Sequence, residues 1–111
     1  PKLAGKLDGM AIRVPTPDVS VVELVVNLER TATVDAVNAA MRTAESKIFG
    51  YNDKPLVSID FTHDAHSSIF DASQTKVLGD NLVHVTAWYD NEWGFSNRMC
   101  DTAVAMGKLI K

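Results

Sequence analysis

The apolar positions of this chain recur at strand spacing in some segments and at helix spacing in others. Over residues 82–89 apolar and polar positions alternate and several side chains are β-branched or aromatic, which predicts a strand. The valine-rich segment 19–29 predicts a longer strand, buried on much of both faces. Shorter strands are expected at residues 7–14, 56–61, 68–71 and 75–78.

Two segments have the spacing of amphipathic helices. Thr33 is expected to be the N-cap of a helix over residues 34–46, where apolar side chains recur every three or four positions. A second helix is expected from Glu92 onward. Its apolar stripe consists of Phe95, Met99, Ala103, Met106 and Ile110. Because an uncovered stripe is an association liability, we expect the isolated chain to self-associate or to need a partner.

Turn-forming residues separate these elements. Turns or loops are expected at residues 15–17, 50–55 and 62–66, and a hairpin turn at 79–81. Two strands joined by the short 15–17 turn would be antiparallel. The order β-β-α-β-β-β-β-α therefore predicts an α+β fold, with a mostly antiparallel or mixed sheet and helices on one face.

Composition and charge narrow the class of protein. The chain has 111 residues, of which 46% are hydrophobic and 23% charged, as in one ordinary globular domain or part of one. The net charge of −3 and the lack of a basic stripe argue against nucleic-acid binding. No apolar run reaches the roughly 18 residues that a membrane span requires. A single cysteine fits a reducing, cytoplasmic location, and the start without Met indicates a piece of a longer sequence.

Arg13 is a candidate phosphate ligand. It lies between Ile12 and Val14 in a predicted strand. A guanidinium that faces inward must be paired, because an unpaired buried charge is costly, and its planar fork matches phosphate. A solvated or salt-bridged arginine is the alternative.

Asn91 is a candidate ligand-binding residue. It lies where the predicted strand 82–89 ends and the C-terminal helix begins. Strand ends that meet helix starts are where α/β enzymes place ligand-binding groups. The alternative is that the Asn91 side chain is the N-cap of the helix.

Two further patterns imitate catalytic sites. Asp60, His63, Asp64 and His66 have offsets that suit a divalent ion, although a polar loop attracts such residues for solvation alone. Ser67 lacks the Gly-x-Ser-x-Gly elbow of a serine hydrolase. We therefore expect neither a metal site nor a serine triad.

The segment also lacks the sequence features of a thiol nucleophile and of a dinucleotide fold. Cys100 lies in the middle of the predicted C-terminal helix, where a small packed residue is expected. No Gly-x-Gly-x-x-Gly turn is present. No catalytic residue is therefore expected in this segment.

Four longer motifs stand in this order along the chain: Gly-Met-Ala-Ile-Arg-Val-Pro-Thr-Pro at residues 9–17, Val-Ser-Val-Val-Glu-Leu at 19–24, Pro-Leu-Val-Ser-Ile-Asp-Phe at 55–61 and Ala-Trp-Tyr-Asp-Asn-Glu-Trp-Gly-Phe-Ser at 87–96. Together they resemble the phosphorylating glyceraldehyde-3-phosphate dehydrogenases of bacterial type. The resemblance covers nearly the whole chain and corresponds to the last third of such an enzyme. It implies a partial catalytic domain at residues 1–91 and a C-terminal helix at 92–111, with the Rossmann domain absent from the segment.

The resemblance also implies roles for four residues. Arg13 would help bind the attacking inorganic phosphate. Asn91 would hydrogen-bond the nicotinamide carboxamide of NAD. Tyr89 and Phe95 would line the pocket, and Phe95 keeps the ring but not the hydroxyl of the tyrosine that many members have there.

In the family, a cysteine thiolate attacks the aldehyde of glyceraldehyde 3-phosphate. Hydride then passes to the nicotinamide, and phosphate attacks the resulting thioester. The resemblance thus implies a glycolytic, cytoplasmic, homotetrameric oxidoreductase. Its cofactor would be NAD, with NADP left open because the discriminating acidic residue lies in the dinucleotide fold. The family's Ser-Cys-Thr-Thr-Asn motif is absent here, so the segment alone is expected to be inactive.

Two alternative functions remain. An erythrose-4-phosphate dehydrogenase would share the residues at 60–67 and the pair Gln74 and Thr75, which also recur in proteobacterial glyceraldehyde-3-phosphate dehydrogenases. An alternative of another class is a stand-alone, non-catalytic binding or oligomerisation module.

Overall fold

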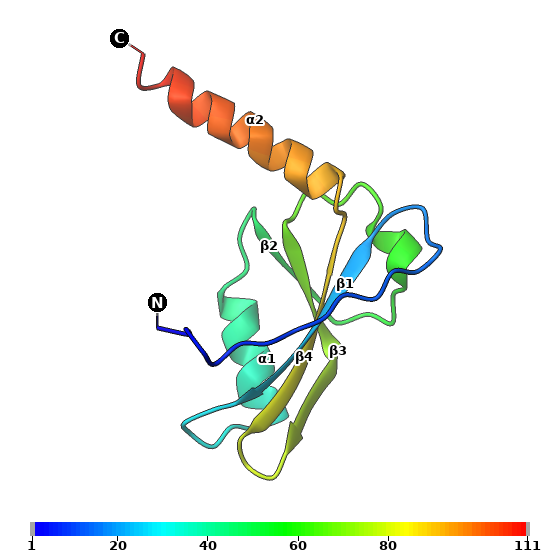
Figure 1. Ribbon diagram of the computed structural model, residues 1–111, viewed down its shortest axis with the longest axis vertical. Helices are drawn as coiled ribbons and strands as arrows, with labels where there is room; N and C mark the ends of the chain where they lie inside the picture. Colours follow the sequence, from blue (N-terminus) through cyan, green and yellow to red (C-terminus); the bar gives the residue numbers. More distant parts are fainter. Residues whose placement is uncertain (1, 111) are drawn as a thin grey trace.

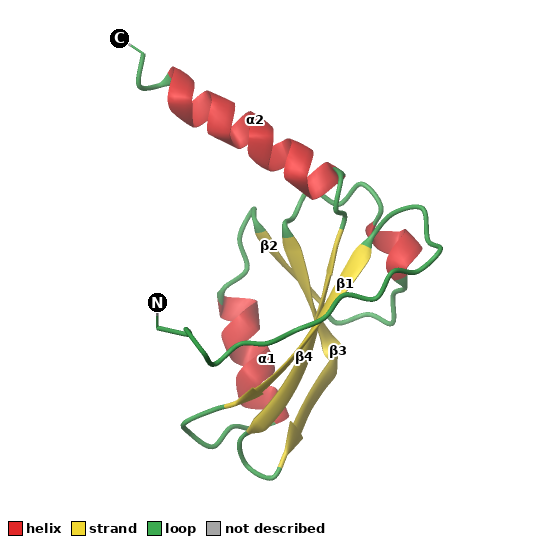
Figure 2. Cartoon of the chain, viewed as in Figure 1, coloured by secondary structure: helices red, strands yellow, loops and turns green. Residues whose placement is uncertain are grey.

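The protein is described by a computed structural model over residues 2–110, and its centre is a mixed four-stranded sheet (Figures 1 and 2). The strands lie in the order β1-β4-β3-β2, with β1 and β3 antiparallel to β4 and β2 parallel to β3. The α+β class predicted from the sequence is confirmed. In chain order the elements are β1 (Ser20–Asn27), α1 (Val34–Thr43), β2 (Phe49–Asn52), the 3-10 helix η1 (Ser58–Phe61), β3 (Ser68–Leu78), β4 (Leu82–Tyr89) and α2 (Trp93–Gly107).

The most strongly patterned elements form as predicted. β4 has the predicted bounds, and the hairpin before it contains Gly79 with a φ of 50°, a conformation that favours glycine. Thr33 caps α1, since its Oγ1 accepts a hydrogen bond from the Ala36 N–H at 3.1 Å. α1 lies against β3, where the Asn38 side chain donates to the Ala72 carbonyl at 3.3 Å.

Two predicted strands are absent, and one predicted loop is partly a strand. Residues 7–14 form no strand and pair with no other segment of residues 2–110, so the expected antiparallel pair with β1 is absent. The segment predicted as a strand at 56–61 ends in η1, where the Asp60 carboxylate accepts the Val57 N–H at 2.8 Å and so favours a turn. The loop expected at 50–55 begins inside β2.

β3 is one strand, where two were predicted. Its pairing with β4 is irregular between Asp71 and Lys76. Asp71 is buried and accepts hydrogen bonds from the Ser73 hydroxyl at 2.6 Å and from the Trp88 ring N–H at 3.0 Å. These side-chain bonds stabilise a bulge, which a period-two pattern does not reveal.

Apolar side chains of β1 and α2 are exposed in the structure. β1 is an edge strand, and its side chains Val21, Val22, Leu24 and Val25 are 42% to 60% exposed, so the prediction of burial on both faces is wrong. α2 extends away from the end of the sheet (Figure 1). Only α1 covers a face of the sheet among the described residues. No helix within residues 2–110 is long and apolar enough to cross a membrane.

The small core lies close to the end of the sheet from which α2 leaves. It consists of Val19, Phe61 and Ile69, with Leu56 and Trp88 packed against them. Phe61 stacks on Trp88 with ring centroids 5.5 Å apart. Each large apolar side chain that is buried stabilises the folded state by about 1.5–3 kcal/mol. The members of this cluster lie in or beside η1 and at the ends of β1, β3 and β4, so their packing holds these segments together.

Candidate functional site

The junction between β4 and α2 is organised by the carboxylate of Asp90. This side chain is only 1% exposed. Its Oδ1 accepts the backbone N–H groups of Glu92 at 2.9 Å and Trp93 at 2.7 Å, and its Oδ2 accepts the N–H of His63 at 2.8 Å. One side chain therefore joins the strand end, the helix start and the loop at residues 62–66.

Asp90 remains charged despite its burial. Burial alone raises the pKa of a carboxyl group, but the hydrogen bonds from the N–H groups of Trp93, His63 and Glu92 outweigh it and lower the pKa of Asp90. A negative charge at this position also interacts favourably with the positive end of the α2 dipole.

The loop at residues 62–66 is tied to the helix start by close contacts. His63 has a φ of 63°, and its ring packs on Trp93 with centroids 5.1 Å apart. A Cβ at Gly94 would lie 2.7 Å from the carbonyl oxygen of His66, so only glycine allows α2 to approach this loop. Asp64 accepts the backbone N–H of His66 at 2.9 Å. Among the described residues, no three His, Cys, Asp or Glu side chains are placed to hold a metal ion.

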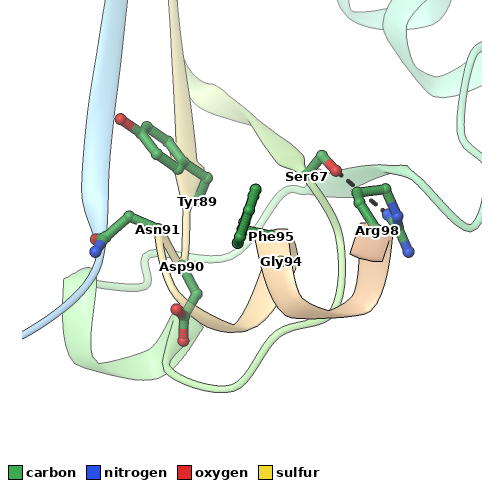
Figure 3. Close-up of a pocket in the computed structure, with 7 residues that line it drawn as sticks. All are labelled: Ser67, Tyr89, Asp90, Asn91, Gly94, Phe95 and Arg98. Carbon is green, nitrogen blue, oxygen red and sulfur yellow. Dashed lines mark hydrogen bonds between the residues drawn. The ribbon is translucent and has the colours of Figure 1, made fainter. Parts of the chain in front are cut away.

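Beside this junction lies an open hollow of about 330 Å³ (Figure 3). Figure 3 shows Tyr89 and Asn91 on one side of it, Ser67 and Arg98 on the other, and the Phe95 ring between them. Asn91 and Phe95 are exposed and Tyr89 is half-buried. The hollow is lined by Ser67, Tyr89, Asp90, Asn91, Gly94, Phe95 and Arg98.

Asn91 contributes an amide at the rim of the hollow. Its Oδ1 accepts a hydrogen bond from the hydroxyl of Ser20 at 3.2 Å. The alternative that Asn91 is the N-cap is wrong, because the N–H groups at the start of α2 are bonded by Asp90. The amide of Asn91 can therefore still bind a ligand.

The opposite side of the hollow anchors α2. Arg98 donates from Nη1 to the Ser67 hydroxyl at 3.3 Å and from Nε to Asp101 at 2.9 Å, and Lys47 also donates to Asp101 at 2.8 Å. The hydrogen bond from Lys47, together with Arg98, lowers the pKa of Asp101. Since Arg98 is already engaged by two protein groups, it has a structural role at this site.

The structure brings three of the four predicted site residues together. Tyr89, Asn91 and Phe95 line one hollow, but Arg13 does not. Arg13 is exposed in an extended segment and has no ion pair within residues 2–110, so the strand position predicted for it is wrong and its side chain is solvated, as the alternative had it. Cys100 is also exposed, contrary to the packed position expected, because α2 projects into solvent.

Several residues that shape the site were not predicted. Asp90 had a recognisable signal, since aspartate is a preferred N-cap residue whose side chain accepts the N–H groups two and three positions further on, here those of Glu92 and Trp93. Ser20 and Ser67 had none, because they reach the site through strand pairing and loop packing between segments far apart in the sequence.

A mixed sheet with an amide and aromatic rings around a hollow at a strand end is typical of the ligand-binding part of an α+β enzyme domain. Residues 1–91 match the family described as glyceraldehyde 3-phosphate dehydrogenase, C-terminal domain. The chain belongs to this family, which confirms the resemblance seen in its motifs.

Curated relatives support the same assignment. The chain is 55% identical over 114 residues to the glyceraldehyde-3-phosphate dehydrogenase of Cereibacter sphaeroides, an alignment that covers 99% of this chain and 34% of the relative. The enzymes of the same name from Xanthobacter flavus and Pseudomonas aeruginosa are 57% and 58% identical, with 98% and 96% of this chain covered and 34% and 32% of theirs. The chain thus spans about a third of the length of the relatives that it matches.

Proposed function

We propose that the chain is the C-terminal part of an NAD-dependent, phosphorylating glyceraldehyde-3-phosphate dehydrogenase. In this proposal residues 1–91 belong to the catalytic domain and 92–111 form the C-terminal helix. The single observation that supports it best is the exposed amide of Asn91 beside the rings of Tyr89 and Phe95. The cysteine nucleophile and the dinucleotide fold would come from other parts of the complete protein.

The hollow suits the nicotinamide end of a dinucleotide. An asparagine amide offers both a donor and an acceptor, as does the carboxamide of nicotinamide. The faces of Tyr89 and Phe95 offer apolar surface to a flat ring. When bound, NAD would accept the hydride, with NADP as the alternative cofactor. The role of this chain would be to orient the nicotinamide ring through Asn91 and to shield it from water with the two aromatic side chains.

Arg13 would help bind inorganic phosphate, the second substrate beside glyceraldehyde 3-phosphate. The proposal for Arg13 rests on its motif, Met-Ala-Ile-Arg-Val-Pro-Thr, and on the fit of a guanidinium fork to phosphate. Its exposed side chain is free to meet groups from other parts of the enzyme. We further propose that the complete enzyme is a cytoplasmic homotetramer of glycolysis, and the exposed apolar residues of β1 and α2 support association.

Two alternatives to this proposal have distinct tests. An erythrose-4-phosphate dehydrogenase would be identified by comparing turnover of the two aldehydes by the complete protein. A stand-alone binding module is supported by the same exposed apolar residues. It would be excluded by a Ser-Cys-Thr-Thr-Asn motif in the residues that precede Pro1 in the complete protein.

Asn91→Ala in the complete enzyme is expected to weaken NAD use and slow hydride transfer. Loss of one buried hydrogen bond to the carboxamide corresponds to about 1–3 kcal/mol, or roughly 5- to 150-fold in rate. Steady-state kinetics with NAD varied would measure this. Asn97→Ala is a matched control, because Asn97 bonds only the Trp93 carbonyl of its own helix among the described residues. Kinetics that are equal in both variants would contradict the assignment of Asn91.

Arg13→Leu is expected to raise the requirement for inorganic phosphate more than the requirement for NAD. A charge-assisted hydrogen bond is worth about 1.5–3 kcal/mol, so the apparent KM for phosphate should rise roughly 10- to 150-fold. Separate titrations of phosphate and NAD would measure the two effects. Arg30→Leu removes another exposed arginine, outside the motif, and serves as the control. Equal losses for both ligands would indicate that Arg13 is structural.

A further inference from the structure

The Asn91 amide is held by a residue that lies 71 positions earlier in the chain. The hydroxyl of Ser20 donates to Asn91 Oδ1 at 3.2 Å. We propose that Ser20 is a positioning residue, which fixes the orientation of the Asn91 amide for the nicotinamide carboxamide. This inference rests on the proposed function of Asn91.

The pairing of two strands places Ser20 at the site. Ser20 is the first residue of β1 and lies opposite Tyr89, the last residue of β4. Asn91 follows two positions after Tyr89, in the turn that leads to α2. The Ser20 hydroxyl therefore meets the turn at the point where the sheet ends, and a slip of one residue would turn it to the opposite face.

The backbone just before Ser20 is strained. Val19 has a φ of 67°, a conformation that is rare for a β-branched residue and costs on the order of 1–3 kcal/mol. Two interactions offset this cost. The Asp18 carboxylate accepts the Val19 N–H at 2.7 Å, and the Val19 side chain is buried in the core with Phe61 and Ile69. The core thus fixes the place at which β1 begins, and with it the position of Ser20.

The hydrogen bond from Ser20 leaves the ligand-binding groups of Asn91 available. The bond uses one lone pair of Oδ1, while the two donors of Nδ2 and the second lone pair are not involved. Asn91 is exposed, so without Ser20 its amide would sample several orientations. An amide that is already oriented loses less entropy when a ligand binds, which strengthens binding without a new ligand contact.

Calorimetric titration of the complete protein tests this role without relying on turnover. The two probes are NAD and a dinucleotide whose pyridine ring lacks the carboxamide. The informative pair is Ser20→Thr and Ser20→Val, because the two side chains have the same shape, both suit a strand, and only threonine keeps a hydroxyl. Ser20→Ala is a second variant without the hydroxyl, and Ser68→Ala is a control at another strand serine.

Removal of the hydroxyl is expected to weaken NAD binding about 3- to 10-fold, as the loss of one exposed hydrogen bond does. Binding of the probe without a carboxamide should not change, and Ser20→Thr should bind NAD like the wild type. In the Asn91→Ala background, Ser20→Val should have no further effect, because the two residues act as one unit.

The outcomes separate this inference from the function on which it rests. If Ser20→Val and Ser20→Ala weaken both probes equally, or neither probe, Ser20 is not a positioning residue and the inference is overturned. NAD is expected to bind more tightly than the probe without a carboxamide. If Asn91→Ala removes this preference but the Ser20 variants keep it in full, only the inference is overturned. If Asn91→Ala keeps the preference, the proposed function of Asn91 is wrong and the inference is overturned with it.

Discussion

The purified 111-residue chain is expected to produce no NADH from glyceraldehyde 3-phosphate, phosphate and NAD. Its one thiol, Cys100, lies within α2, away from the helix N-terminus that activates a thiolate, and no nucleophile motif surrounds it. The chain also contains no Gly-x-Gly-x-x-Gly turn, which a dinucleotide fold uses to approach the pyrophosphate. The loss relative to the complete protein should be total, because the covalent step has no nucleophile.

The assay needs a thiol-specific comparison. The complete protein, measured in parallel, supplies the positive control. Iodoacetamide-treated samples of both proteins supply the blanks, because alkylation removes any reaction that depends on a cysteine. Production of NADH by the isolated chain above its own alkylated blank would show that Cys100 performs the chemistry, and would overturn the expectation.

Asp90→Ala is expected to cause a large loss of stability. The substitution leaves three N–H groups, those of His63, Glu92 and Trp93, without their acceptor at a nearly inaccessible position. We expect the free energy of unfolding to fall by about 2–4 kcal/mol. Urea denaturation followed by tryptophan fluorescence would measure this, since Trp93 lies within the affected turn.

Two variants make the test of Asp90 specific. Asp53→Ala removes an exposed carboxylate whose partner Arg42 is also exposed, so it should change stability little. In Asp90→Asn one carboxylate oxygen becomes an NH₂ group, which cannot accept a hydrogen bond. The remaining oxygen can accept either from Glu92 and Trp93 or from His63, but not from both sides. The loss of stability should therefore lie between those of Asp53→Ala and Asp90→Ala. If Asp90→Ala proves as stable as Asp53→Ala, the Asp90 carboxylate does not stabilise the start of α2 as proposed.

The contribution of Asp90 should also depend on pH. Because the folded state lowers the pKa of Asp90, its stabilisation is complete above the unfolded-state value of about 4. It is lost as the pH falls through the lower pKa of the folded state. Asp90→Asn should therefore flatten the dependence of stability on pH in this acid range and leave it unchanged near neutrality.

Local sequence determined the elements that carry their own signals. The alternation in β4, the Thr33 cap of α1 and the turn residues at 79–81 are satisfied by neighbouring groups, and each was predicted correctly. The motif around Asn91 also helped to identify the family, because a motif consists of residues that are close together in the sequence. Tyr89, Asn91 and Phe95 could be grouped from the sequence because a strand end and one helical turn keep them adjacent.

Tertiary structure decided the features that depend on distant partners. Residues 7–14 have the composition of a strand, but a strand forms only where another strand satisfies its N–H and C=O groups, and no segment of residues 2–110 does so. Arg13 is therefore exposed and separate from the hollow. Whether apolar side chains of β1 and α2 are buried likewise depends on the surfaces that meet them, which periodicity alone does not specify.

The sequence by itself therefore determined the family, the α+β class and the residues of the turn between β4 and α2. Only the tertiary structure showed that Ser20 reaches Asn91 and that Asp90 binds the 62–66 loop to the helix start. The physical reason is the range of the interactions. Caps, turns and periodicity act over a few residues, whereas strand register and core packing join positions whose separation in the chain carries no local signal.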